Sequence, residues 1–142
     1  MKISLVGLIV LVALLSGCGG GGGSVEHAYI TTPNGFTFSI IDHDISYGDV
    51  LQFEESHLYA IQVRPGFQYT VYLDTTAGDS DLYLYYDYTL APLSLMTYSD
   101  LSGLLVDSST FYADFNGTVY IEVYGAESSQ YLISVTEALV VN

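Results

Sequence analysis

The chain has 142 residues, half of them hydrophobic, and its 16 Asp and Glu residues stand against only 2 Lys or Arg, which gives a formal net charge of -14 at pH 7. So negative a surface repels nucleic acid phosphates and anionic lipid headgroups, which excludes both as ligands and leaves cations as the natural counterpart. The chain has 14 Tyr and 6 Phe but a single Cys. Composition therefore predicts one folded domain that needs no disulfide.

The first residues have the pattern of an exported protein. Lys2 precedes an apolar run over residues 3–15, which is shorter than the roughly 18 residues that a membrane-spanning helix needs. The sequence Leu15-Ser16-Gly17-Cys18 resembles the bacterial lipobox, in which the cysteine receives a diacylglyceryl group and the chain is cut just before it. We expect residues 1–17 to be a lipoprotein signal peptide and Cys18 to be the lipidated residue. A free thiol beside a conventional cleavage site is the alternative.

A glycine tract separates the expected anchor from the domain. Residues 18–24 comprise Cys18, five glycines and Ser24, and a coil of this composition spans roughly 13 Å on average. Two or three acyl chains hold a protein stably on its membrane. In enterobacteria, an aspartate directly after the lipidated cysteine retains a lipoprotein in the inner membrane. This chain has Gly19 at that position, which indicates the outer membrane. The predicted location is the cell envelope, with the membrane as a partner through the lipid.

Beyond the tether, short runs rich in Tyr, Val, Ile, Leu, Phe and Thr alternate with turn-forming residues, and no segment has a sustained helical period. Glycine, proline and short polar residues predict turns at 64–66, 77–79, 116–117 and 125–129. The pattern favours an all-β fold, an antiparallel, jelly-roll-like β-sandwich of about eight or nine strands. Strands are expected at 37–41, 50–53, 58–63, 68–74, 81–86, 94–98, 109–114, 118–124 and 131–136.

Successive side chains of a strand point to opposite faces, so alternation predicts which residues are buried. The expected core comprises Tyr69, Val71, Leu73, Leu82, Leu84, Tyr86, Val119, Ile121, Val123, Tyr131, Ile133 and Val135. Tyrosine combines a large contact area with a polar tip, so outward-facing tyrosines are candidate ligand-binding residues. An ordinary role in covering the sheets is the competing interpretation. The outward-facing candidates are Tyr72, Tyr83, Tyr85, Tyr120 and Tyr124.

Three motifs follow one another along the chain. Leu58 to Leu73 reads as strand, Pro-Gly turn and strand, Gly78 to Tyr85 reads Gly-Asp-Ser-Asp-Leu-Tyr-Leu-Tyr, and a glycine-bounded strand over 116–125 precedes Gln130 to Val135. Together they resemble the bacterial pre-peptidase C-terminal domain, a small β-sandwich appended to secreted proteases and other exported proteins. The resemblance covers residues 57–137 and implies a non-catalytic accessory domain.

The remaining segments lie outside that resemblance. Residues 25–56 are expected to form N-terminal strands and acidic loops of the sandwich, and residues 138–142 a C-terminal tail. The chain also reads Glu54-Glu55-Ser56-His57 where the family often has a pair of aspartates ahead of the strand. The role of residues 25–56 is open.

The resemblance also implies a metal site. Asp79 and Asp81 occupy the aspartate positions of the family motif Asp-x-Asp-Leu-Tyr-Leu, and in calcium-dependent relatives loop carboxylates and backbone carbonyls hold Ca²⁺, which takes about six to eight oxygen ligands. Calcium is therefore the candidate cofactor. The competing interpretation is that Asp79 caps its turn and Asp81 bonds to a neighbouring loop.

Other polar clusters give weaker signals. The acidic stretch from Asp42 to Asp49 lacks the spacing of an EF-hand, and His27, His43 and His57 lack the paired spacing of a zinc site. The sequence has no Gly-x-Ser-x-Gly nucleophile elbow and no Ser-x-x-Lys. We therefore expect no enzyme activity.

Two functional hypotheses follow. The first is a non-catalytic envelope lipoprotein that acts as a binding or adhesion module for an extracellular or envelope protein or polysaccharide, with calcium as its stabilising ion. The second is a structural or assembly lipoprotein that supports another envelope protein and has no ligand of its own. A compact patch of exposed tyrosines favours the first, and scattered tyrosines favour the second.

Overall fold

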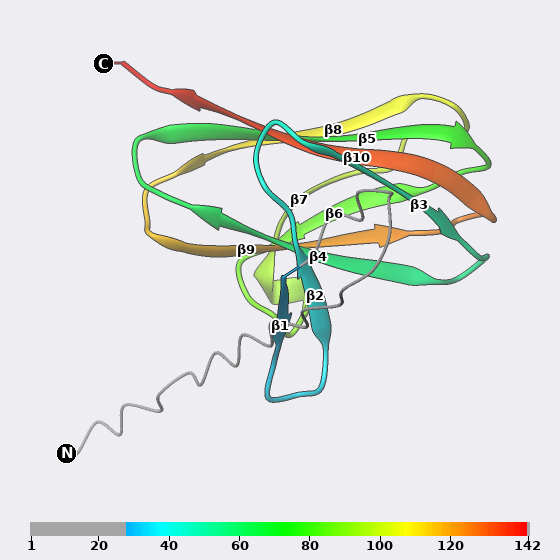
Figure 1. The fold of residues 1–142 in the computed structure, drawn as a ribbon, viewed down its shortest axis with the longest axis horizontal. Coiled ribbons are helices and arrows are strands. Elements are labelled where there is room, and N and C mark those ends of the chain that lie inside the picture. The colour runs from blue at the N-terminus through cyan, green and yellow to red at the C-terminus, as the bar shows by residue number, and fades with distance from the viewer. Residues whose placement is uncertain (1–27, 142) are drawn as a thin grey trace, which may run out of the picture.

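Two β-sheets packed face to face make up residues 28–141, the part of the chain that the computed structural model describes (Figure 1). The six-stranded sheet has the order β1-β2-β4-β9-β6-β7, and the four-stranded sheet has the order β3-β10-β5-β8. The predicted signal peptide, Cys18, the glycine tether and His27 lie outside the described residues. The described part contains no helix long and apolar enough to cross a membrane.

The described residues form ten strands and one short helix, joined by loops. Neighbouring strands are antiparallel except for β2 and β4, which run parallel over two residue pairs. The elements are β1 (Tyr29–Thr31), β2 (Thr37–Ile40), β3 (Ser46–Leu51), β4 (Ser56–Val63), β5 (Phe67–Ala77), β6 (Asp81–Tyr85), the 3₁₀ helix η1 (Pro92–Ser94), β7 (Leu95–Ser99), β8 (Val106–Ala113), β9 (Gly117–Tyr124) and β10 (Ser129–Leu139).

The predicted β-sandwich is confirmed, with one expected strand misplaced and one missed. The strand expected at 50–53 was wrong, because β3 begins at Ser46 and ends at Leu51. Gly48 and Asp49 are poor strand formers, but they pair with β10 at Leu132 and Tyr131. The missed strand, β1, has three residues and pairs only with β2.

The core lies between the sheets and follows the predicted alternation. The inward side chains of β9, Val119, Ile121 and Val123, are fully buried. Side chains from β5, β6 and β10 join them in one cluster, which includes Tyr69, Val71, Leu73, Leu82, Leu84, Tyr131, Ile133 and Val135.

Tyr86 is the one expected core residue that the structure places elsewhere. Its side chain is 58% exposed, because β6 ends at Tyr85 and its register with β7 shifts between Leu84 and Tyr85. The alternation that predicts a buried position does not extend past the strand end.

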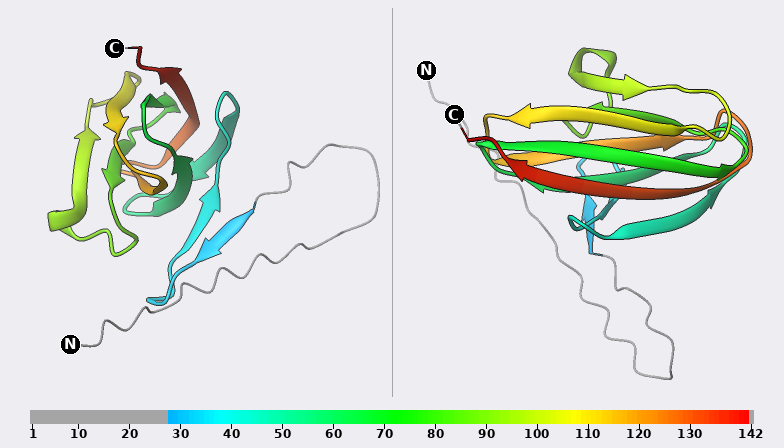
Figure 2. Two further views of the ribbon diagram at one scale, coloured as in Figure 1. Left: turned by 90° about the vertical axis from the view of Figure 1, so that its left-hand side faces the viewer. Right: turned by 90° about the horizontal axis from the view of Figure 1, so that it is seen from above.

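A second, smaller cluster covers part of the outer face of the six-stranded sheet. Phe38 of β2 packs edge-on against Tyr120 of β9 with ring centroids 4.9 Å apart. Ala60 and Tyr85 are buried in the same cluster, and Tyr88 packs against it. The β1–β2 hairpin diverges from the sandwich (Figure 2), and the cluster joins it to the main body.

Candidate functional site

Four loops meet at the end of the sandwich on the right of Figure 1. They connect β3 to β4, β5 to β6, β7 to β8, and β9 to β10, and comprise residues 52–55, 78–80, 100–105 and 125–128. We call this surface the loop end. It contains Asp79, one of the two predicted calcium ligands, and borders Asp81, the other.

Hydrogen bonds join the four loops in series. The Glu54 N–H donates to the Gly125 carbonyl over 2.9 Å, and the Phe53 N–H donates to Ser128 Oγ over 3.3 Å. The loop over 125–128 continues the series, because the Glu127 N–H donates to the Asp79 carbonyl over 3.0 Å. Loops that are far apart in sequence thus form one continuous surface.

Two glycines permit this close packing. Gly78 has φ 76°, and a Cβ at this position would lie 2.1 Å from the Ser128 carbonyl oxygen. A Cβ at Gly125 would lie 2.5 Å from the Gln52 carbonyl oxygen. Neither position accepts a side chain without moving backbone, so the packing of the loop end requires glycine at both.

Asp107 anchors the loop over 100–105 from inside the sandwich. Its side chain is fully buried, and its Oδ1 accepts hydrogen bonds from Ser99 Oγ at 2.5 Å and from the Leu101 N–H at 2.8 Å. The sequence analysis did not identify this residue, because Asp107 lies before the strand expected at 109–114, whereas β8 begins at Val106. Its burial fixes where β8 begins and how the loop approaches it.

Asp79 holds the same loop from the other side. Its Oδ1 accepts a hydrogen bond from the Gly103 N–H over 2.9 Å, across 24 residues of sequence. Burial raises the pKa of Asp81 above its ordinary value, and the carboxylates of Asp79 and Asp107 raise it further. The carboxylates of Asp79 and Asp81, the two predicted calcium ligands, therefore repel each other.

The calcium prediction rests on those two carboxylates alone. Within residues 28–141 there is no group of three or more His, Cys, Asp or Glu side chains placed to hold a metal ion. An ion at Asp79 and Asp81 has to take most of its oxygen ligands from backbone carbonyls and water. Calcium binding stays a prediction.

The loop end has both apolar and acidic side chains exposed on its loops. Phe53 is 62% exposed and Leu104 is 65% exposed. The exposed carboxylates of the same loops are Glu54, Glu55, Asp100 and Glu127. Arg64, the one Lys or Arg among residues 28–141, lies in the β4–β5 turn at the opposite end of the sandwich (Figure 1).

The predicted tyrosine set does not form one exposed patch. Tyr72 lies on β5 in the four-stranded sheet, and the other four lie on β6 and β9 in the six-stranded sheet. Tyr85 and Tyr120 lie on the outer face as expected but are not exposed, because the cluster around Phe38 covers them. Alternation gives the face on which a side chain lies but not whether another segment covers that face.

The tyrosines of the six-stranded sheet instead make contacts within the molecule. Tyr83 stacks on Tyr98 with ring centroids 6.1 Å apart, and the Tyr85 hydroxyl donates to Glu122 Oε2 over 3.0 Å. Burial raises the pKa of Tyr83, Tyr85 and Tyr120. Tyr124 is half-buried at the end of β9.

Comparison with known proteins identifies the fold. No protein-family model matches the chain, and no curated protein sequence matches it. Among solved structures, the chain is similar to the pre-peptidase C-terminal domain of a collagenase from Bacillus anthracis, with a TM-score of 0.54 and 16% identity over 68% of this chain and 92% of that one.

A second similar structure has a different role. It is Aeromonas hydrophila PliG, a periplasmic inhibitor of g-type lysozyme, with a TM-score of 0.56 and 12% identity over 70% of this chain and 94% of that one. At such identities the likeness concerns the fold alone. The described residues therefore have a β-sandwich fold similar to that of a pre-peptidase C-terminal domain.

Proposed function

We propose that this chain is a non-catalytic binding module of the cell envelope, held to a membrane through lipid on Cys18, which presents its loop end to a positively charged protein. The observation that carries the proposal is the composition of the loop end. Its four loops are hydrogen-bonded into one surface on which apolar side chains such as Phe53 and Leu104 adjoin exposed carboxylates.

Such a surface suits a protein partner for two reasons. Exposed apolar side chains are common at interaction sites, and recognition interfaces combine apolar with polar groups. Exposed carboxylates on the same surface attract a basic partner and orient it before contact. Among the described residues no Lys or Arg lies at this end to oppose that attraction.

The similar structures are compatible with this proposal. PliG from Aeromonas hydrophila is described as a periplasmic inhibitor of a lysozyme, so that sandwich acts on another protein. The Bacillus anthracis sandwich is a domain of a collagenase. A role in the envelope also agrees with the signal peptide and lipobox that the sequence predicts.

A second candidate is a structural or assembly lipoprotein with no ligand of its own. The observation that favours it is the use of the tyrosines, because Tyr85 and Tyr120 are buried under the chain's own segments and Tyr72 lies on the other sheet. Scattered, covered aromatic residues are what a purely structural role predicts. In that case the loop end contacts a fixed neighbour in an envelope assembly.

Binding to a panel of proteins separates the two candidates. The full-length chain in detergent is immobilised, and association is measured for a g-type lysozyme, cytochrome c as a second basic protein, and an acidic albumin, at low and high salt. Saturable binding of a basic protein that weakens with salt supports the binding module. No binding to any of the three contradicts it and favours the structural alternative.

Matched charge variants locate the contact. The double variant Glu54→Gln/Glu127→Gln removes two exposed charges from the loop end, and Asp42→Asn/Asp114→Asn removes two exposed charges elsewhere. We expect the first to weaken binding by about tenfold or more and the second by much less. Equal losses would indicate a nonspecific response to net charge and would overturn the assignment of the surface.

A further inference from the structure

A cleft lies at the open edge of the sandwich, where β2 of one sheet faces β3 of the other. Its volume is about 290 Å³, and its wall combines tyrosine rings, two serine hydroxyls and one carboxylate. The cleft shares no residue with the loop end, and none of the five tyrosines predicted to bind a ligand lines it. The lining residues are Tyr29, Ser39, Ser46, Tyr47, Gly48, Asp49 and Tyr59.

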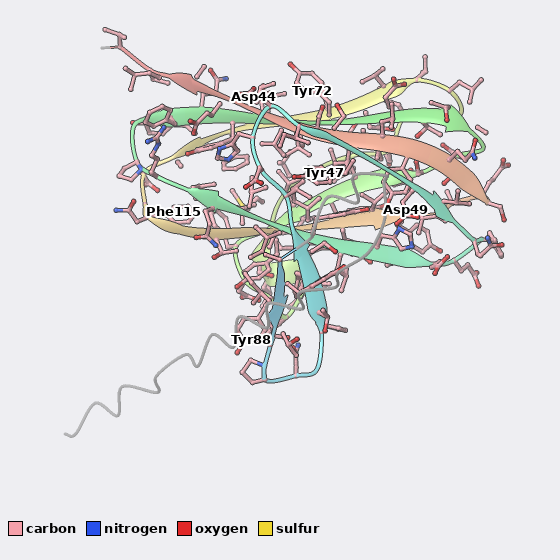
Figure 3. The ribbon with its side chains drawn as sticks, viewed as in Figure 1. Asp44, Tyr47, Asp49, Tyr72, Tyr88 and Phe115 are labelled. Carbon is pink, nitrogen blue, oxygen red and sulfur yellow. The ribbon has the colours of Figure 1, made fainter. Side chains whose placement is uncertain are left out.

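β3 supplies most of one wall. Four consecutive residues, 46–49, line the cleft, and Figure 3 labels Tyr47 and Asp49 along this strand. The Tyr47 hydroxyl accepts a hydrogen bond from the Asp42 N–H over 3.0 Å. Asp49 Oδ1 accepts one from the Val50 N–H over 2.8 Å. Both side chains are therefore fixed by backbone groups.

A row of buried polar groups supports the opposite wall. The Tyr59 hydroxyl lies 2.6 Å from that of Tyr131, which in turn lies 2.7 Å from His57 Nδ1. His57 Nδ1 is also 3.4 Å from Asp49 Oδ2, so the row returns to the cleft. Tyr59 and Tyr131 are both buried, and such a row holds its members in one arrangement.

Within this row, the Tyr59 hydroxyl has either a donor or an acceptor position left for a further hydrogen bond. Burial raises the pKa of Tyr59 to about 12, and burial raises that of Tyr131 as well, so both phenols keep their protons at neutral pH. A phenol has one donor and two acceptor positions, and the direction of the row depends on the tautomer of His57. Tyr59 is thus able to donate to a ligand in one arrangement and accept from it in the other.

The lining selects a class of ligand. Asp49 and the large excess of acidic residues disfavour an anion, while the hydroxyls of Ser39 and Ser46 disfavour a hydrocarbon. A single carboxylate is too few for a multivalent metal ion. Groups that both donate and accept, beside flat aromatic rings, match a molecule that carries many hydroxyls on a ring with apolar C–H faces.

We propose that this cleft binds a neutral saccharide unit, either one sugar ring or the end of a glycan chain. Its volume of about 290 Å³ lies just below the roughly 300 to 1000 Å³ of ligand pockets, which limits the ligand to a small molecule or the end of a larger one. Hydroxyls of the sugar bond to Asp49, the serines and Tyr59, and a ring face packs on Tyr29, whose side chain is 51% exposed. This site goes beyond the proposed protein contact at the loop end and does not require it.

Saturation-transfer NMR on the full-length chain tests the proposal, in a detergent that has no sugar headgroup. The probes are glucose, galactose, mannose and N-acetylglucosamine, with N-acetylneuraminic acid as an anionic comparison. We expect transfer to the ring protons of at least one neutral sugar and weaker transfer to the anionic one. Absence of transfer to all four neutral sugars would overturn the proposal.

Variants tie the signal to the cleft. Asp49→Asn keeps the acceptor for the Val50 N–H but removes the charge, and we expect it to weaken sugar binding by about fivefold or more. Asp114→Asn, an exposed carboxylate outside the cleft, is the matched control and should bind as the parent does. An equal effect of both variants contradicts the site, provided that their thermal midpoints show both are folded.

The two proposals fail independently. Glu54→Gln/Glu127→Gln changes the loop end and leaves every lining residue of the cleft in place. We expect this variant to lose affinity for the basic protein and to keep its sugar signal. Sugar binding without protein binding rejects the proposed function alone, and the reverse result rejects only the cleft.

Discussion

Arg64 Nη2 lies 2.8 Å from Glu137 Oε1, which joins the β4–β5 turn to β10 across 73 residues of sequence. The guanidinium of Arg64 also lies 4.0 Å above the ring of Phe67. Glu137 has a second neighbour, because its Oε2 is 3.6 Å from His43 Nδ1. The one Lys or Arg of residues 28–141 is thus bound within the molecule.

Replacing Arg64 with alanine tests the contribution of this pair to stability. The variant loses the ion pair and the contact with Phe67, and we expect a loss of about 1 kcal/mol in the free energy of unfolding. The value is small because the Arg64 side chain is 57% exposed. Urea unfolding measures it, with Asn116→Ala as an exposed control, and an unchanged midpoint would mean that solvent screens the pair completely.

Asp107 should matter more than its neighbours on β8, because it holds the loop over 100–105. Asp107→Ala removes the acceptor for Ser99 Oγ and the Leu101 N–H, and we expect a loss of about 2 kcal/mol. Hydrogen exchange of the Leu101 and Gly103 amides should rise with it. Asp107→Asn retains an acceptor oxygen and should lose less stability. If the amides of the loop exchange as slowly in both variants as in the parent, the anchoring role is contradicted.

Buried phenols predict a loss of stability at alkaline pH. Burial raises the pKa of Tyr59 from 10.0 to about 12, so between these values the unfolded chain has released a proton that the folded chain retains. Stability from this group is fully present below pH 10 and falls as the pH rises towards 12. Urea unfolding from pH 8 to 11 measures the slope, which should be shallower in Tyr59→Phe. A slope that is unchanged in this variant refutes the assignment.

Calcium at Asp79 and Asp81 predicts a rise in the thermal midpoint. An ion that binds only the folded state stabilises it, and relief of the repulsion that raises the pKa of Asp81 adds to the effect. Because few side-chain ligands are present, we expect the rise only at millimolar Ca²⁺. Asp81→Asn should abolish this rise. A thermal midpoint that is equal in Ca²⁺ and in chelator would contradict the predicted calcium site.

Lipid on Cys18 predicts membrane association that depends on that residue. In the parent, we expect the mature chain in the membrane fraction, with a mass that includes the acyl chains. Cys18→Ala cannot receive the diacylglyceryl group, so its mass should lack the lipid. A free, unmodified cysteine in the purified parent would rule out the anchor.

The sandwich itself was predictable because period-two alternation is local. Val119, Ile121 and Val123 can be assigned to the core from seven consecutive residues, and the structure buries all three. β3 was misplaced because its pairing with β10 outweighs the weak strand preference of Gly48 and Asp49. Tertiary pairing of that kind leaves no trace in a short window of sequence.

The functional surfaces were less predictable because they depend on long-range contacts. His57 and Tyr131 meet across 74 residues, and Tyr85 is buried by segments that no alternation rule includes. Asp79 was identified from a motif, yet its contact with Gly103 spans a loop whose path the motif does not contain. The residue types were visible in the sequence, and the partners were not.

The position of Arg64 also leaves the carboxylates of the loop end without an opposing Lys or Arg among residues 28–141. Its positive charge lies at the β4–β5 turn, while the exposed carboxylates of Glu54, Asp100 and Glu127 lie at the opposite end. A basic surface therefore attracts the loop end during approach. Salt should therefore slow capture of a basic partner more than it hastens release.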